Sequence, residues 1–324
     1  MKMKNVVVGI LSACLLSTSF TGVLHVQAKE TLMTNEEVVE EIPQVYLEAL
    51  GRDVEWKDFI RPITAKDKKR FDKKIKKYYS KMDSSASKLT KSTDLAYLDS
   101  TCSAKGHGSI GIASALLNGE EVTLLTLGGT NIKEGQASGV KEDILSALEL
   151  SNQYLRNVVK MFDAVDENME PLIPQERPVI VSGISLGGMV AQQLLAQKDI
   201  MKRFDIQQII CFGSPLLEPF KRNDDTRVVR FCDSMDIVPY LGRSVLHDTI
   251  RQEVLNKDPL KYVQKLDEKE VILKDGGYKS FISAHMLSYI EGKCWKKYDA
   301  LGVYGGHNKI VMLEDLQFFE NPSR

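Results

Sequence analysis

A serine framed by glycines is the feature of this 324-residue sequence with the clearest chemical meaning. Ser185 is the central residue of a G-x-S-x-G pattern at residues 183–187, and a predicted strand precedes it while a predicted helix follows it. A serine in that setting occupies a strained strand-to-helix turn, and the glycines let the neighbouring elements approach closely. The backbone N–H of Leu186, at the start of the helix, would face a negatively charged oxygen. The pattern predicts that Ser185 is a catalytic nucleophile.

A nucleophilic serine on such a turn needs a histidine to accept its proton and a carboxylate to orient that histidine. Along the chain the three follow in the order serine, acid, histidine. Two acids, Asp233 and Asp236, come shortly after a predicted strand, where they would lie at the same edge of the sheet as the serine. Three histidines follow the serine, namely His247, His285 and His307. Spacing alone leaves both acids and all three histidines open.

Short apolar runs alternate with longer helical segments from about residue 96 onward. The predicted strands are residues 110–117, 122–127, 179–182, 208–212 and 228–231. The predicted helices are residues 140–162 and 189–197. Apolar strands that alternate with helices are typical of a mainly parallel sheet covered by helices on both faces. The sequence therefore predicts an α/β fold.

Composition and charge argue against a nucleic-acid-binding protein and against a protein built around a structural metal. The chain has 43 Lys and Arg against 44 Asp and Glu, so it has no overall attraction for phosphate and we expect no nucleic-acid partner. Its five cysteines form no C-x-x-C pair and no zinc-like spacing with histidine, so no structural metal is expected. Two of them, Cys211 and Cys232, lie in apolar strand-like runs, which leaves Cys102 and Cys294 as the one pairing open to a disulfide.

The first 28 residues have the three parts of a secretory signal peptide. Lys2 and Lys4 precede an apolar run over residues 6–24, and small residues follow at positions 26–28. We expect the mature protein to be secreted or held in the cell envelope. An alternative cleavage before Cys14, in the sequence Leu-Ser-Ala-Cys, would instead produce a lipid-anchored protein.

A charged, mainly helical extension is predicted over residues 29–95. Residues 29–60 carry 9 acids and 3 bases, whereas residues 61–91 carry 12 bases and 3 acids. Within the basic part five apolar side chains recur at helical spacing: Phe71, Ile75, Tyr78, Tyr79 and Met82. Such a helix packs its apolar stripe on the domain and leaves its lysines in water, or it lies on an anionic membrane surface. The first interpretation is preferred and the second stays open.

Four motifs in order make the sequence resemble the class 3, fungal-lipase-like triacylglycerol lipases. They are G-x-S-L-G-G at residues 183–188, F-G-S-P at 212–215, D-I-V-P at 236–239, and a histidine followed by a tyrosine within 284–289. The resemblance covers residues 105–292. It implies an α/β-hydrolase fold for a domain that we place at residues 96–324.

The resemblance also assigns roles to particular residues. It implies Ser185 as the nucleophile, Asp236 as the orienting acid and His285 as the base. It implies an oxyanion hole, the site that holds the negatively charged oxygen of the reaction intermediate, formed by the backbone N–H groups of Thr130 and Leu186. No cofactor takes part in this chemistry.

The sequence departs from the family pattern at two positions beside these residues. Ile184 stands where the family usually has histidine, and Gly128 stands where it usually has arginine. The segment 131–148 corresponds to the family's lid, but it has no tryptophan and contains Gly135 and Gly139. None of these positions transfers protons, so the chemistry is expected to be retained.

Taken together, the sequence predicts an exported serine hydrolase that cleaves carboxylic esters of acyl lipids through an acyl-enzyme. It would be a lipase or esterase, with phospholipids among the candidate substrates. One alternative is a lipase-fold binding or surface protein that has lost catalysis, since fold does not settle function. Another is a hydrolase of a different acyl substrate, such as a thioester, a peptide or a polysaccharide-linked ester.

Overall fold

A computed structural model describes the central and C-terminal parts of the chain. The described residues are 58, 61, 63–82, 88–102, 108–130, 146, 151–215, 217, 226–236, 238–241 and 271–323. The predicted signal peptide, His247, nearly all of the acidic stretch and nearly all of the predicted lid lie outside the described residues.

A nine-stranded sheet forms the centre of the described structure, and its middle is parallel. Five strands pair side by side in parallel: β3 (Glu120–Leu127), β4 (Val179–Ile184), β5 (Ile206–Phe212), β6 (Arg227–Asp233) and β7 (Val271–Lys274). Four strands extend the sheet in antiparallel pairing: β2 (Ile110–Leu117), β8 (Ile310–Met312), β1 (Lys88–Leu89) and β9 (Gln317–Phe319). The strand order is β1-β8-β2-β3-β4-β5-β6-β7, with β9 beside β2.

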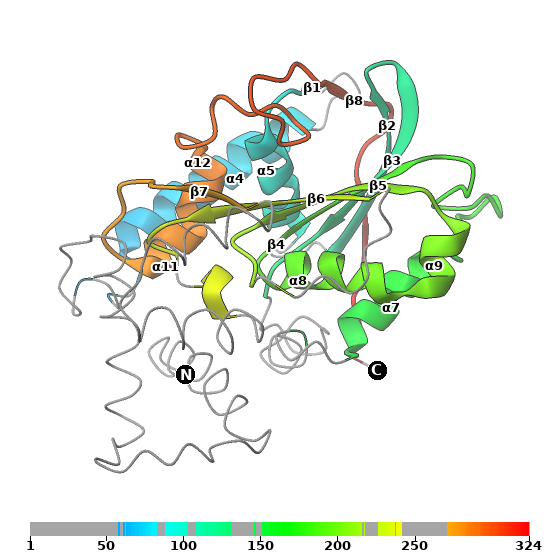
Figure 1. Cartoon of the computed structure of the whole chain (residues 1–324), viewed down its shortest axis with the longest axis horizontal. Helices are drawn as coiled ribbons and strands as arrows, with labels where there is room; N and C mark the ends of the chain where they lie inside the picture. The colour runs from blue at the N-terminus through cyan, green and yellow to red at the C-terminus, as the bar shows by residue number, and fades with distance from the viewer. Residues whose placement is uncertain are drawn as a thin grey trace, which may run out of the picture.

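Helices cover both faces of this sheet (Figure 1). One layer contains α7 (Gln153–Met161), α8 (Leu186–Gln193), a 3₁₀ turn (Leu194–Ala196) and α9 (Lys198–Arg203). The opposite layer contains α4 (Ala65–Met82), α5 (Ser92–Cys102) and α12 (Tyr289–Glu291). Successive strand residues alternate between the layers: Val181 belongs to the apolar cluster under α7 and α8, whereas Ile180 belongs to the cluster under α5. Because both faces are buried, the strands are apolar throughout, as predicted.

The five predicted strands are confirmed, but one predicted helix is wrong in part. The helix expected over residues 140–162 does not run continuously, because α7 begins only at Gln153. Asn152 has an extended backbone (φ −132°, ψ 168°). Its side-chain oxygen accepts a hydrogen bond from the backbone N–H of Leu155 at 2.9 Å. Asn152 therefore caps the N-terminus of α7 and separates it from the residues before it.

The one disulfide pairing that the sequence left open, Cys102 with Cys294, is not formed. All four cysteines in the described part of the chain are free thiols. Cys102 is buried, and its sulfur lies 3.0 Å from the hydroxyl oxygen of Thr126. Cys102 therefore packs as a small apolar residue with one weak polar contact.

The basic helix α4 packs its apolar stripe against the domain. Ile75 is buried with Leu287 and Ile290, and Phe71 packs against the same cluster. Arg70 forms an ion pair with Glu291 in α12. The lysines of α4 are mostly exposed: Lys66, Lys68, Lys69, Lys73, Lys76 and Lys77. Phe71 and Ile75 therefore pack on the domain, as the preferred interpretation of the apolar stripe predicts.

The N-terminal part of the described chain is continuous with the core of the domain. The boundary expected between residues 95 and 96 falls inside α5, whose residues Leu95, Ala96 and Leu98 are buried in the core. Among the described helices, none has both the length and the apolar character needed to cross a membrane.

A carboxyl group is buried beside the strand that leads to Ser185. Asp99 in α5 is fully buried, and one of its oxygens accepts a hydrogen bond from the Ser182 hydroxyl at 2.7 Å. The other oxygen has no hydrogen-bond partner among the described residues. Burial raises the pKa of Asp99 well above its ordinary value, and the hydrogen bond from Ser182 only partly opposes this. Asp99 is therefore protonated in the folded protein at pH values where the unfolded chain is ionised.

Replacement of Asp99 by asparagine is expected to reduce the dependence of stability on pH. Because the folded-state pKa is raised, Asp99 contributes stability below its unfolded pKa that is lost as pH rises through the folded pKa. In that window the loss is about 1.4 kcal/mol per pH unit. Urea unfolding at a series of pH values above the unfolded pKa should show the free energy of unfolding of Asp99→Asn improving relative to wild type as the pH rises towards the folded-state pKa. Identical pH dependence in the two proteins would contradict a protonated Asp99, and the exposed Asp315→Asn is the control.

Candidate active site

Ser185 occupies a strained turn between β4 and α8. Its backbone has φ 53° and ψ −121°, a positive φ that few non-glycine residues adopt. The N–H of Ser185 donates to the carbonyl oxygen of Phe212 at 2.9 Å, which fixes the turn to β5. The Ser185 side chain does not cap the helix. Its hydroxyl is therefore available to a group outside α8.

The glycines around Ser185 allow three elements to meet closely. A Cβ at Gly187 would collide with the carbonyl oxygen of Leu127 at the end of β3. A Cβ at Gly183 would lie 2.5 Å from the carbonyl group of Gly187, and one at Gly188 would collide with the Ser214 hydroxyl. A side chain at any of these three positions would thus collide with a neighbouring element, which is why the sequence pattern has glycine there.

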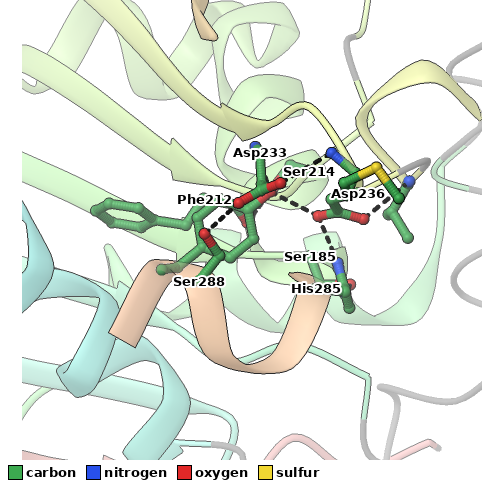
Figure 2. Close-up of polar contacts among 10 residues, drawn as sticks. Ser185, Phe212, Ser214, Asp233, Asp236, His285 and Ser288 are labelled. Atoms are coloured by element: carbon green, nitrogen blue, oxygen red, sulfur yellow. Dashed lines mark hydrogen bonds and ion pairs between the residues drawn. The ribbon is translucent and has the colours of Figure 1, made fainter. Parts of the chain in front are cut away.

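Ser185, His285 and Asp236 form a continuous hydrogen-bonded series (Figure 2). The Nε2 atom of His285 lies 3.0 Å from Oγ of Ser185, and its Nδ1 atom lies 2.8 Å from Oδ2 of Asp236. The side chain of Asp236 is fully buried, whereas that of His285 is 22% exposed. The carboxylate accepts a hydrogen bond from the Nδ1–H group, which leaves the Nε2 lone pair directed at the serine hydroxyl. The imidazole can therefore exchange a proton with Ser185 at the edge of solvent.

Two further donors hold the Asp236 carboxylate. The Tyr289 hydroxyl donates to Oδ2 at 2.6 Å, and the backbone N–H of Val238 donates to Oδ1 at 3.0 Å. Val238 begins a 3₁₀ turn (Val238–Leu241). Burial raises the pKa of Tyr289 well above its ordinary value, and the charge of Asp236 raises it further, so the phenol stays protonated as a donor.

The helix that carries His285 is wound to bring two side chains to one carboxylate. His285 lies in a π-helical turn (Ala284–Ser288) between α11 (Phe281–Ser283) and α12. His285 and Tyr289 are four residues apart and both reach Oδ2 of Asp236. π-Helical turns are rare and occur frequently at functional sites. The F-G-S-P glycine, Gly213, has φ 55°, and a Cβ there would lie 2.5 Å from the Tyr289 ring and 2.8 Å from Oδ2 of Asp236.

The second candidate acid, Asp233, braces the same segments without contacting the imidazole. It accepts hydrogen bonds from the N–H of Met235 at 2.8 Å and of Gly276 at 2.9 Å, and from the Ser288 hydroxyl (Figure 2). Burial raises the pKa of Asp233 to about 6, the hydrogen bonds oppose this rise, and the charge of Asp236 adds to it. Asp233 thus ties the loop of Asp236 to the helix of His285.

The loop after β3 lies against the serine turn. A Cβ at Gly129 would lie 3.2 Å from the carbonyl oxygen of Ile184 and 3.3 Å from Cβ of Ser185, so the two segments lie close together. The fully buried Tyr154 of α7 donates its hydroxyl to the carbonyl oxygens of Ser109 at 2.7 Å and Gly128 at 3.0 Å. Thr130 follows directly, and Leu186 is the first residue of α8, where backbone N–H groups have no acceptor within the helix. Thr130 and Leu186 thus stand on the two segments that meet at Ser185.

The structure selects among the residues that spacing left open. It brings together Ser185, Asp236 and His285, and it places His307 in the exposed loop between α12 and β8. Two residues that hold this site, Tyr289 and Tyr154, had no role predicted from the sequence. The four-residue spacing between His285 and Tyr289 was a usable signal for Tyr289. No local signal in the sequence marks Tyr154. Within the described residues, no cluster of three or more His, Cys, Asp or Glu side chains could hold a metal ion.

A mainly parallel sheet flanked by helices, with a serine on the turn after a central strand, defines the α/β-hydrolase fold, as predicted. Residues 135–292 match the model of one family with this fold, described as the PGAP1-like alpha/beta domain. It is a hydrolase family of the lipase and esterase type. The matched segment contains Ser185, Asp236 and His285. No curated protein matched the chain, and no solved structure matched it. The resemblance to class 3 lipases in particular remains a prediction.

Proposed function

We propose that this protein is an exported serine hydrolase that cleaves carboxylic esters of acyl lipids. The observation that carries the proposal is the hydrogen-bonded series from Ser185 through His285 to Asp236 on a strained turn. The family match to a hydrolase of the lipase and esterase type supports ester chemistry. Neither feature alone would be sufficient, since fold does not determine function.

In the proposed reaction His285 moves one proton in each half of the cycle. Nε2 accepts the Ser185 proton as Oγ attacks the ester carbonyl carbon, and the protonated imidazole then donates that proton to the departing alcohol. The acyl group is left on Ser185 as an ester. A water molecule gives a proton to His285 and attacks this acyl-enzyme, which releases the carboxylic acid and returns the proton to Ser185.

The proposed oxyanion hole uses the backbone N–H groups of Leu186 and Thr130. Support comes from the position of Leu186 at the start of α8 and from the close approach of Gly129 to the turn of Ser185. Donors directed at the developing negative charge stabilise the transition state. One such donor is worth about 3 kcal/mol of barrier in other serine hydrolases.

Labelling with a fluorophosphonate probe tests whether Ser185 is activated. The wild-type protein should be labelled, and Ser185→Ala should not be, because the probe reacts only with a serine whose proton is removed. A control with heat-denatured wild type should also stay unlabelled. Wild-type protein that resists the probe would instead support the alternative of a lipase-fold binding or surface protein without catalysis.

The proposed substrate class is tested separately by an ester panel. We expect hydrolysis of p-nitrophenyl acyl esters and of acylglycerol or phospholipid vesicles, with all activity lost in Ser185→Ala. Activity confined to thioesters, peptides or acylated polysaccharides would retain the serine mechanism and reject the acyl-lipid substrate.

Replacement of Tyr154 by phenylalanine is expected to loosen the proposed oxyanion loop. The variant removes the hydroxyl that donates to Gly128, so kcat should fall about tenfold with little change in KM, and stability should fall by about 1 kcal/mol. Tyr278→Phe is the matched control, because it removes a tyrosine hydroxyl that donates to Glu291 instead. Steady-state kinetics and urea unfolding measure both effects. A loss of kcat no larger than that of the control would contradict the positioning role.

We propose two further properties from the N-terminal sequence. Export through residues 1–28 predicts that the mature protein begins at Lys29, which N-terminal sequencing of the exported protein tests; a lipid-modified Cys14 would contradict it. The basic segment 61–91 is also proposed to contact anionic membrane. The contact would use its exposed lysines and not its apolar stripe, because the Ile75 side chain is already buried in the domain. Liposome binding independent of phosphatidylglycerol content and salt would contradict this contact.

A further inference from the structure

A hollow lies on the α4–α5–α12 side of the sheet, separate from Ser185. Its volume is about 480 Å³, and it is formed by the residues between β1 and α5 and by the loop between α12 and β8. These segments lie side by side in Figure 1, near β1. None of the residues that line the hollow belongs to the proposed catalytic series.

The lining of the hollow is strongly basic. Lys91, Lys296, Lys297 and His307 line it, and all four are exposed. The one acid in the lining is Asp299, whose residue surface is 3% exposed. Its carboxylate faces inward and accepts hydrogen bonds from the backbone N–H groups of three residues of its own loop: Leu301, Val303 and Asn308. The lysines therefore dominate the charge that a ligand entering the hollow would meet.

The loop that carries these lysines is anchored at several points. Trp295, next to Lys296, is buried and stacks on the Tyr289 ring with 5.1 Å between ring centres. Ser92 donates its hydroxyl to the carbonyl oxygen of Asp299, which ties the loop to α5. The hollow is therefore a built feature of the fold.

An exposed aromatic ring stands at the rim. Tyr304 is 63% exposed, and the Nζ atom of Lys297 lies 6.0 Å from the centre of its ring. This cation–π contact holds the ammonium group over the ring. The ring itself presents an apolar face beside the positive charge.

We propose that this hollow binds a phosphate-bearing ligand. Several ammonium groups around one concave surface fit a phosphate, which presents more than one negatively charged oxygen, better than a single carboxylate. Lysine is an effective phosphate ligand because it acts as a compact point charge with freely rotating donors. The Tyr304 face would contact the organic group that carries the phosphate. The phosphate could belong to a lipid headgroup or to a soluble phosphate ester, and these share the same recognition chemistry.

Two variants with the same change in charge test the proposal. The hollow variant is Lys91→Gln, Lys296→Gln and Lys297→Gln in one chain. The control is Lys160→Gln, Lys198→Gln and Lys202→Gln, which removes three exposed lysines from the α7–α9 layer. Both variants keep the lysines of α4, so they separate this site from membrane contact through residues 61–91. Both should have wild-type unfolding midpoints and wild-type hydrolysis of a soluble ester.

Binding is measured by calorimetry with glycerol 3-phosphate and by sedimentation with phosphatidylglycerol and phosphatidylcholine vesicles. We expect the hollow variant to bind at least ten times more weakly than wild type, while the control matches wild type. Loss of glycerol 3-phosphate binding would identify a soluble phosphate ester, and loss confined to phosphatidylglycerol vesicles would identify a lipid headgroup. Equal losses in both variants, or wild type that binds neither probe, would overturn the proposal without affecting that for Ser185.

Discussion

Replacing Ser185 with alanine is expected to lower kcat for ester hydrolysis roughly 10⁶-fold, and replacing His285 with alanine should cost about as much. The two atoms Oγ and Nε2 lie 3.0 Å apart and act in one step, because the serine is a useful nucleophile only while the imidazole accepts its proton. With either partner missing, the other has nothing left to contribute.

The same reasoning predicts strong non-additivity. The double variant Ser185→Ala with His285→Ala should be no slower than either single variant, because all three retain only substrate binding and the oxyanion donors. Steady-state kinetics on one soluble ester measure this, with the exposed Ser151→Ala as the control. Losses that multiply in the double variant would mean that Ser185 and His285 act independently.

Replacing Asp236 with asparagine is expected to lower kcat about 10⁴-fold while the protein stays folded. Asp236 accepts from Tyr289, Val238 and His285, and the asparagine NH₂ group cannot replace an acceptor oxygen. The imidazole would then favour the tautomer with its proton on Nε2, which cannot accept the serine proton. KM should change little, because Asp236 is buried and contacts no substrate.

Asp233→Asn is the matched control for this prediction. Asp233 is also buried and lies three residues earlier, at the end of β6, but its carboxylate accepts hydrogen bonds from Met235, Gly276 and Ser288. Its replacement should lower the unfolding midpoint and reduce kcat less than tenfold. If Asp233→Asn instead caused the 10⁴-fold loss and Asp236→Asn did not, the assignment of the orienting acid would be reversed.

The parallel core and the serine turn were predictable because their signals are local. The apolar runs of β4, β5 and β6 reflect burial on both faces of the sheet, and the glycines beside Ser185 reflect close approach of backbones. The choice of Asp236 over Asp233 could not come from spacing. It depends on a π-helical turn that brings His285 and Tyr289 to one oxygen, which is set by packing between distant segments.

Other features show where sequence signals were missed or absent. The pair Asn118–Gly119 has φ 53° and 102°, the conformation of a tight hairpin turn, and it joins β2 to β3. Asn152 is a helix cap, and this was a local signal against a continuous helix over residues 140–162. In contrast, strands β1, β8 and β9 are two or three residues long and exist only through pairing with distant segments.

Trapping the acyl-enzyme tests the central claim most directly. Wild-type protein mixed with a slowly hydrolysed p-nitrophenyl ester and quenched in acid should gain the mass of one acyl group, and peptide mapping should locate that group on Ser185. The released p-nitrophenol should equal one molecule per molecule of enzyme in the first turnover. An acyl group found on another residue, or rapid turnover with no acyl group on Ser185, would contradict a covalent serine mechanism.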